Sequence, residues 1–137
     1  MLVLSVVGLV DGDHAMQLYK VLEGIQVWRE KLHVEDMWSN PNELSEAMNK
    51  LAVYNSYLAE HIAPLHKKAT ETEILAYKRE RQNNVKLGDS SMSAKLEGLE
   101  SRHDYEHVKL VNKSVSDLTN VIQSRLKVLS EQARSNI

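Results

Sequence analysis

The feature that most constrains this chain is a run of heptad-spaced apolar residues between about Pro41 and Ala133. Spacing of this kind lays one apolar stripe along one face of a helix. An isolated amphipathic helix leaves its stripe in water, so two such stripes predict two helices that face each other. The first stripe, with Asn55 and Thr72 in the same register, is Leu44, Met48, Leu51, Leu58, Ile62, Leu65, Ala69 and Ala76. The second is Val108, Val111, Val115, Leu118, Ile122, Leu126, Leu129 and Ala133.

The link between the two helices is predicted at residues 88–91, which read Gly-Asp-Ser-Ser. Glycine accepts the positive φ that follows many helix C-termini, and Asp or Ser supplies an N-cap oxygen for the next helix. We therefore expect a long antiparallel hairpin with helices at 42–87 and 91–135. Pro64 removes a backbone donor, which predicts either a bend near residues 60–61 or two stacked helices.

The N-terminal part predicts a shorter helix at 14–33. Residues 1–13 fit a short strand, a helix laid across the hairpin, or a translation-start artefact with the real beginning at Met16. Trp28 and Trp38 are interpreted as anchors that hold the first helix against the hairpin, with an aromatic interaction site as the alternative.

The chain is 137 residues long and has no Phe, which suits narrow seams of Leu, Val and Ala in one all-α domain spanning 1–137. Asn55 in a seam position favours a fixed register and oligomer number. Leu110, Val121 and Val128 widen the apolar surface of the last helix, either to pack under the first helix or to bind copies of the chain. We expect an oligomeric helical assembly.

The charge of the chain is unevenly distributed. Residues 1–60 carry four Lys/Arg against nine Asp/Glu, a net of −5, and residues 61–137 carry thirteen against ten, a net of +3. An anionic partner is therefore expected in the second part. The absence of Cys excludes disulfides and thiolate metal sites. Asp11 interrupts the apolar start well short of a membrane span, so we expect a soluble, intracellular protein with no membrane partner.

Catalytic motifs are missing from the sequence. No P-loop, dinucleotide-binding glycine pattern, nucleophile elbow or zinc-finger spacing occurs. His103 and His107 are four residues apart and could share a metal ion, but a solvated polar stripe is the simpler interpretation. We therefore predict a protein that is not an enzyme and that holds no metal and no cofactor.

Basic residues form two steps along the predicted 42–87 helix, and two more flank the predicted turn. Mobile cations bind phosphates, and an aromatic ring among them gives a base a surface to stack on. Interleaved Glu71, Glu73 and Glu80 also fit an ordinary solvated helix surface. The first step is His66, Lys67 and Lys68, the second is Tyr77, Lys78, Arg79 and Arg81, and the flanking pair is Lys86 and Lys95.

A family resemblance enters at residues 44–49, Leu-Ser-Glu-Ala-Met-Asn, followed at 53–61 by Val-Tyr-Asn-Ser-Tyr-Leu-Ala-Glu-His. This pattern, with the basic segment that leads to Gly88 and the second long helix, resembles the UvsY family of bacteriophage recombination mediators. The resemblance covers roughly residues 30–137.

The resemblance implies a helical oligomer that binds single-stranded DNA and helps a phage recombinase load onto DNA coated with single-strand-binding protein. It implies DNA contacts at Lys78, Arg79 and Arg81, with support from Lys67, Lys68 and Lys86, and Tyr77 joins them as the aromatic of the same step. It also implies assembly through the C-terminal part of the last helix, where the residues are Val115, Leu118, Ile122, Leu126 and Leu129. The expected location is the host cell cytoplasm. The alternative is a non-catalytic structural or adaptor protein that acts through protein–protein contacts.

Overall fold

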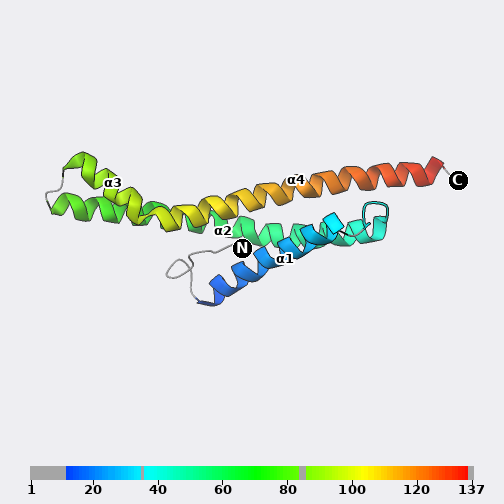
Figure 1. The fold of residues 1–137 in the computed structure, drawn as a ribbon, viewed down its shortest axis with the longest axis horizontal. Helices are drawn as coiled ribbons and strands as arrows, with labels where there is room; N and C mark the ends of the chain where they lie inside the picture. Colours follow the sequence, from blue (N-terminus) through cyan, green and yellow to red (C-terminus); the bar gives the residue numbers. More distant parts are fainter. Residues whose placement is uncertain (1–11, 35, 84–85, 136–137) are drawn as a thin grey trace. The chain divides into compact units, whose positions relative to one another are not determined.

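The computed structural model of the chain describes residues 12–34, 36–83 and 86–135 (Figure 1). Within these residues it contains four helices and no strand, which confirms the all-α fold class. The helices are α1 (Gly12–Val34), α2 (Pro41–Gln82), α3 (Leu87–Glu97) and α4 (Leu99–Ser135). Residues 1–11, which hold most of the segment that the sequence leaves open, lie outside the described residues.

The described residues divide into two compact units. Unit 1 contains Ala59–Leu110 and, of the described residues before them, 12–16; unit 2 contains Gln17–Leu58 and 111–135. The helices α2 and α4 each contribute one segment to each unit, so the division does not cut the sequence into two continuous domains.

Unit 2 is built around a core of leucine, isoleucine and valine from three helices. Apart from Ala47, the buried side chains of α2 and α4 here belong to the predicted stripes, whereas Met48 of the predicted stripe is half-buried. In α1 the buried face includes Leu18, whereas the neighbouring Tyr19 is exposed. Burial of each such side chain contributes about 1.5–3 kcal/mol. The buried set is Leu18, Leu22, Ile25 and Leu32 of α1, Leu44, Leu51 and Leu58 of α2, and Val111, Val115 and Ile122 of α4.

An amide pair inside unit 2 fixes the register of α2 against α4. Asn112 Nδ2 donates to Asn55 Oδ1 at 2.8 Å, and Asn55 Nδ2 donates to Ser116 Oγ at 2.8 Å. Half-buried amides leave polar atoms unsatisfied in any other register, which makes a slip costly. Asn55 therefore finds its partners within its own chain.

The connection between α1 and α2 is held by polar contacts to its backbone. Trp38 Nε1 donates to the carbonyl of Leu32 at 2.9 Å, and Arg125 Nε of α4 donates to the carbonyl of Trp38 at 2.8 Å. Asn40 Oδ1 accepts from the backbone N–H of Asn42 and of Glu43, so Asn40 caps α2. Trp38 thus anchors the end of the first helix, whereas an anchoring role of Trp28 stays a prediction.

Gly24 lets α1 lie directly against α2. A Cβ at this position would lie 2.7 Å from Cζ of Tyr54. The sequence suggests only that Gly24 weakens the middle of its helix, because glycine lowers helix propensity. Its contact with Tyr54 shows that the missing side chain is a condition of packing.

Unit 1 pairs the second half of α2 with α3 and the start of α4, and its core is made largely of small residues. Contacts such as Glu73 with Arg102 and Glu80 with Ser93 show that the paired segments run antiparallel. Small side chains allow close approach of the helix backbones, and at Gly98 a Cβ would lie 2.5 Å from Cγ of Glu73. The buried side chains here are Leu65, Ala69 and Ala76 of α2, Ser90 and Ala94 of α3, and Asp104 and Val108 of α4.

The predicted turn at residues 88–91 is wrong, because all four residues lie in the first part of α3. The N–H of Ser90 bonds to the carbonyl of Lys86 at 2.8 Å, and the Ser90 side chain is buried. Asp89 lies in the first helical turn, where an acid is favoured by the helix dipole. The Gly-Asp-Ser-Ser signal therefore marks a helix start, and α2 ends at Gln82, five residues before the predicted 87.

The predicted helix 91–135 is also divided, at Gly98. Gly98 has φ −82° and ψ 0°, yet its N–H bonds to Ala94 and its carbonyl accepts from Arg102. Gly98 thus keeps two bonds of the α-helical type at the point where α3 ends and α4 begins. At Pro64, by contrast, the helix is not divided, because α2 runs through this residue as one helix. Two stacked helices are therefore excluded, and a bend near residues 60–61 stays a prediction. None of the described helices is long and apolar enough to cross a membrane.

The Gly24–Tyr54 contact makes a testable prediction. Gly24→Ala lowers the free energy of unfolding by about 1–3 kcal/mol, since the added methyl must push the Tyr54 ring out of place. Gly88→Ala is the matched control, because a Cβ at Gly88 meets nothing within 4 Å and a helical Gly→Ala change is neutral or stabilising. Urea denaturation followed by circular dichroism measures both. Equal stability of the two variants contradicts the proposed packing role.

The amide pair makes a second prediction. Asn112→Leu leaves Asn55 Oδ1 without its donor and lowers the free energy of unfolding by about 1–3 kcal/mol. Asn55→Leu combined with Asn112→Leu recovers most of that loss, because both polar groups are removed together. A double-mutant cycle in urea measures the coupling between the two positions. Purely additive losses are the outcome that contradicts a shared register contact.

Candidate nucleic-acid interface

Three of the predicted DNA-binding residues lie on one face of α2 in unit 1. Lys67, Lys78 and Arg81 are separated by 11 and 3 residues, which places them within about 60° of one another around a helix axis. All three are exposed, and they lie opposite the buried Leu65, Ala69 and Ala76. We call Lys67, Lys78 and Arg81, with Ile74 between them, the outer basic face.

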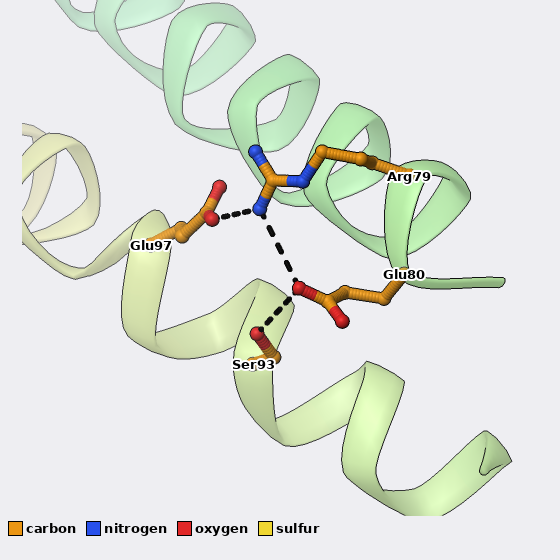
Figure 2. A network of polar contacts seen from close by, with 4 residues as sticks. All are labelled: Arg79, Glu80, Ser93 and Glu97. Atoms are coloured by element: carbon orange, nitrogen blue, oxygen red, sulfur yellow. Dashed lines mark hydrogen bonds and ion pairs between the residues drawn. The ribbon is translucent and has the colours of Figure 1, made fainter. Parts of the chain in front are cut away.

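Arg79, the fourth basic residue of the region, is directed to α3 instead. Its guanidinium forms an ion pair and hydrogen bond with Glu97 and lies 3.6 Å from the carboxylate of Glu80, which also accepts from Ser93 at 3.2 Å (Figure 2). The hydrogen bond and charge of Glu97 raise the pKa of Arg79 above its usual value. The contact with Glu97 joins α2 to α3. The carboxylates of Glu97 and Glu80 also neutralise the charge of Arg79.

The other predicted contacts lie at the edges of the outer basic face or beyond it. Lys68 and Tyr77 are half-buried, each to one side of the line formed by Lys67 and Lys78. Lys86 is exposed and precedes α3. The structure therefore brings three of the seven predicted residues together and separates Arg79 from them.

The acidic residues that interrupt the basic sequence are mostly directed away from the outer basic face. Glu73 binds Arg102 of α4 at 3.1 Å, and Glu80 binds Ser93 of α3. Of the three interleaved acids, Glu71 shares the outer side of the helix, where its carboxylate lies 3.8 Å from Lys67 with both side chains more than half exposed. Such an exposed pair is weak. Charges that alternate in the sequence are thus largely sorted in space.

A second cluster of cations, which the sequence did not reveal, surrounds Tyr105 of α4. The His66 ring meets the Tyr105 ring edge-on with centroids 4.8 Å apart, and the cations of Arg102 and Lys109 lie 5.7 and 5.6 Å from the Tyr105 centroid. The spacings from Arg102 to Tyr105 and on to Lys109 are helical and could have shown part of it. The contact with His66 depends on the pairing of α2 and α4.

The predicted oligomerisation residues are divided by burial in unit 2. Val115 and Ile122 are fully buried in the chain's own core, whereas Leu118, Leu126 and Leu129 are half-buried. Leu110, Val121 and Val128 are 66%, 56% and 41% exposed, so they do not pack under the first helix. Apolar surface of α4 that is open to another molecule therefore lies beside the predicted stripe as well as on the half-buried residues of the stripe itself.

The two rings of the candidate histidine pair are stacked against each other. The rings of His103 and His107 are 17° from parallel with centroids 6.4 Å apart. Across the described part of the chain, no three His, Asp or Glu side chains come close enough together to hold a metal ion. His107 Nε2 is buried, and it neither accepts nor donates a hydrogen bond among the described residues. Burial, followed by the charge of His103, lowers the pKa of His107 below 6.5.

Comparisons with known proteins add no relative. A scan against protein-family models found no matching family, and searches of curated proteins and of solved structures found no matching protein. The resemblance to the UvsY family therefore stays a prediction.

The environment of His107 predicts that stability falls in mild acid. Its native pKa lies below the unfolded value near 6.5, so the unfolded chain binds more protons as the pH drops below about 7, and the free energy of unfolding decreases. His107→Gln flattens this dependence, whereas His33→Gln, at an exposed position of α1, leaves it in place. Urea midpoints measured between pH 7.5 and 5 (about the range in which His titrates) test this. An unchanged pH profile in His107→Gln contradicts it.

Proposed function

We propose that the chain is a single-stranded DNA-binding recombination mediator that helps load a phage recombinase onto DNA coated with single-strand-binding protein, in the host cell cytoplasm. The observation that carries the proposal is the outer basic face. Lys67, Lys78 and Arg81 share one exposed side of α2, while Glu73 and Glu80 are bound to α3 and α4. A sorted face of this kind attracts phosphates more strongly than an alternating one.

The geometry of the outer basic face suits a flexible strand. Fourteen residues separate Lys67 from Arg81, which is about 21 Å along a helix. Such a length offers contacts to several successive phosphates. Ile74 is 46% exposed between the cations, and half-buried Tyr77 lies at their edge, so bases have apolar surface beside the backbone contacts. No base is read specifically by such a face, which suits a mediator that acts on any exposed strand.

Self-association is part of the same proposal. A long antiparallel hairpin with a shorter N-terminal helix, assembled with copies of itself, presents several outer basic faces to one strand. Contacts that are weak singly then act together, because each bound face raises the local concentration of the next. A multimer can in this way compete with single-strand-binding protein for phosphates and hold the freed strand for the recombinase. The half-buried Leu118, Leu126 and Leu129 support assembly through the C-terminal part of α4.

The test uses a variant that removes only the outer charges, with Lys67, Lys78 and Arg81 replaced by Gln. For single strands, each phosphate contact makes the slope of log K against log[salt] more negative by about 0.7. The loss of three contacts is therefore expected to make this slope less steep by about 2. Binding of a fluorescent single-stranded oligonucleotide at several salt concentrations measures the slope. Arg79 stays intact, which keeps the α2–α3 contact.

The matched control replaces Lys20, Lys50 and Lys127 by Gln. These side chains are also exposed but belong to unit 2, so the net charge changes equally while the outer basic face is preserved. We expect the control to keep the wild-type slope. Equal slopes for both variants remove the site. A wild-type chain that does not bind single-stranded DNA favours the structural or adaptor alternative.

A further inference from the structure

The outer side of α3 and the first turn of α4 carries large apolar side chains that the chain leaves in solvent. Met92 and Leu96 are each 67% exposed, and Leu99 is 60% exposed. They recur at intervals of four and three residues, which is the spacing of a heptad seam. We call Met92, Leu96 and Leu99 the outer stripe.

The outer stripe spans the end of α3 and the first residue of α4, on either side of Gly98. Gly98 bonds to Ala94 and accepts from Arg102, and Leu99 follows Met92 and Leu96 at heptad spacing across this interruption. Ser90 and Ala94 are buried, and each lies two positions from a stripe residue, which is about 200° around the helix. The outer stripe therefore faces away from the core of unit 1, where the rest of the unit leaves it uncovered.

The two flanks of the outer stripe carry opposite charge. In heptad terms Leu96 is an a position and Met92 and Leu99 are d positions. Lys95 then occupies the g position on one side, and Glu100 occupies the e position on the other. Both side chains are exposed. In a parallel pair of helices, the g residue of one helix meets the e residue five positions further along its partner, which is the separation of Lys95 and Glu100.

We propose that two copies of the chain pair in parallel through the outer stripe, with Lys95 of each copy opposite Glu100 of the other. A second copy is the occupant because it supplies at once an apolar seam of the same spacing and the complementary charge on each flank. The two-fold arrangement makes the Lys95–Glu100 contact twice. Antiparallel pairing sets the Lys95 flanks of the two copies against each other and the Glu100 flanks against each other, so like charges oppose it.

This pairing rests on the self-association in the proposed function but is independent of its DNA binding. It also differs in place from assembly through Leu118, Leu126 and Leu129, which lie in unit 2. A protein that has two association surfaces, one on α3 and one on α4, can form assemblies larger than a dimer.

Cysteine cross-linking tests the arrangement directly, because the chain contains no cysteine of its own. Leu96→Cys places one thiol per copy at an a position, which adjoins its equivalent in a parallel pair. We expect a covalent dimer on mild oxidation. Ser91→Cys, exposed on the side of α3 away from the stripe, is the matched control and is expected to stay monomeric on a denaturing gel. Absence of the Leu96→Cys dimer overturns the inference.

Charge reversal tests the orientation. Lys95→Glu sets like charges against Glu100 of the other copy and is expected to raise the dissociation constant about tenfold in sedimentation. Adding Glu100→Lys restores opposite charges in the parallel pair and is expected to restore association. A double variant as weak as Lys95→Glu alone contradicts the parallel arrangement. Circular dichroism confirms that each variant keeps its helix content.

Sedimentation of Leu96→Glu combined with Leu99→Glu separates this inference from the proposed function. We expect smaller species than the wild type, with the dissociation constant raised about 100-fold or more by loss of the apolar contact. Unchanged mass in this variant overturns pairing through the outer stripe while self-association elsewhere is retained. A wild-type chain that is monomeric overturns self-association as well, and its binding to single-stranded DNA is then measured on the monomer.

Discussion

The structure depends on one constraint: each amphipathic helix of this chain must cover its apolar stripe with another helix. Without Phe, and with two Trp and five Tyr, the chain has few bulky aromatic side chains with which to build a thick core. Unit 2 covers its stripes with leucine-rich packing of three helices, and unit 1 covers its stripe with small residues such as Ala69, Ala94 and Gly98 that bring backbones close. Neither stripe of α2 or α4 is stable in water alone.

That constraint also decides which residues face outward. Once Leu65 and Ala76 are buried, the helical period directs Lys67, Lys78 and Arg81 to the opposite side of α2. Burial of Ser90 and Ala94 directs Met92 and Leu96 outward on α3 in the same way. The outer basic face and the outer stripe thus follow from the same seam, one presenting charge and the other apolar surface.

How much the sequence predicts follows from which signals are local. Most of the α2 seam is predicted from the sequence, because heptad spacing is a property of one helix, although Ala47 is buried outside the predicted stripe and Met48 and Ile62 within it are half-buried. The turn is misplaced since Gly88, Asp89 and Ser90 suit a helix start as well as a reversal, and the choice depends on where Ser90 packs. Gly24 is undervalued for a similar reason, as its role becomes visible only with Tyr54 beside it. A sequence pattern does not show which residues from distant segments will be in contact.

The arrangement of charges at the candidate site could not be predicted from the sequence for the same reason. In the sequence, Glu73 and Glu80 alternate with the cations and suggest an ordinary solvated surface. In the structure these carboxylates bind Arg102, Arg79 and Ser93 at the inner edge of α2. Arg79 loses its availability by the same contacts that remove Glu80 from the outer side. A carboxylate paired at a helix–helix contact contributes less negative potential to the far face than a free one does, because its partner's charge cancels it at distance. The pairing of α2 with α3 and α4 therefore holds Glu73 and Glu80 away from the outer basic face without any change in net charge.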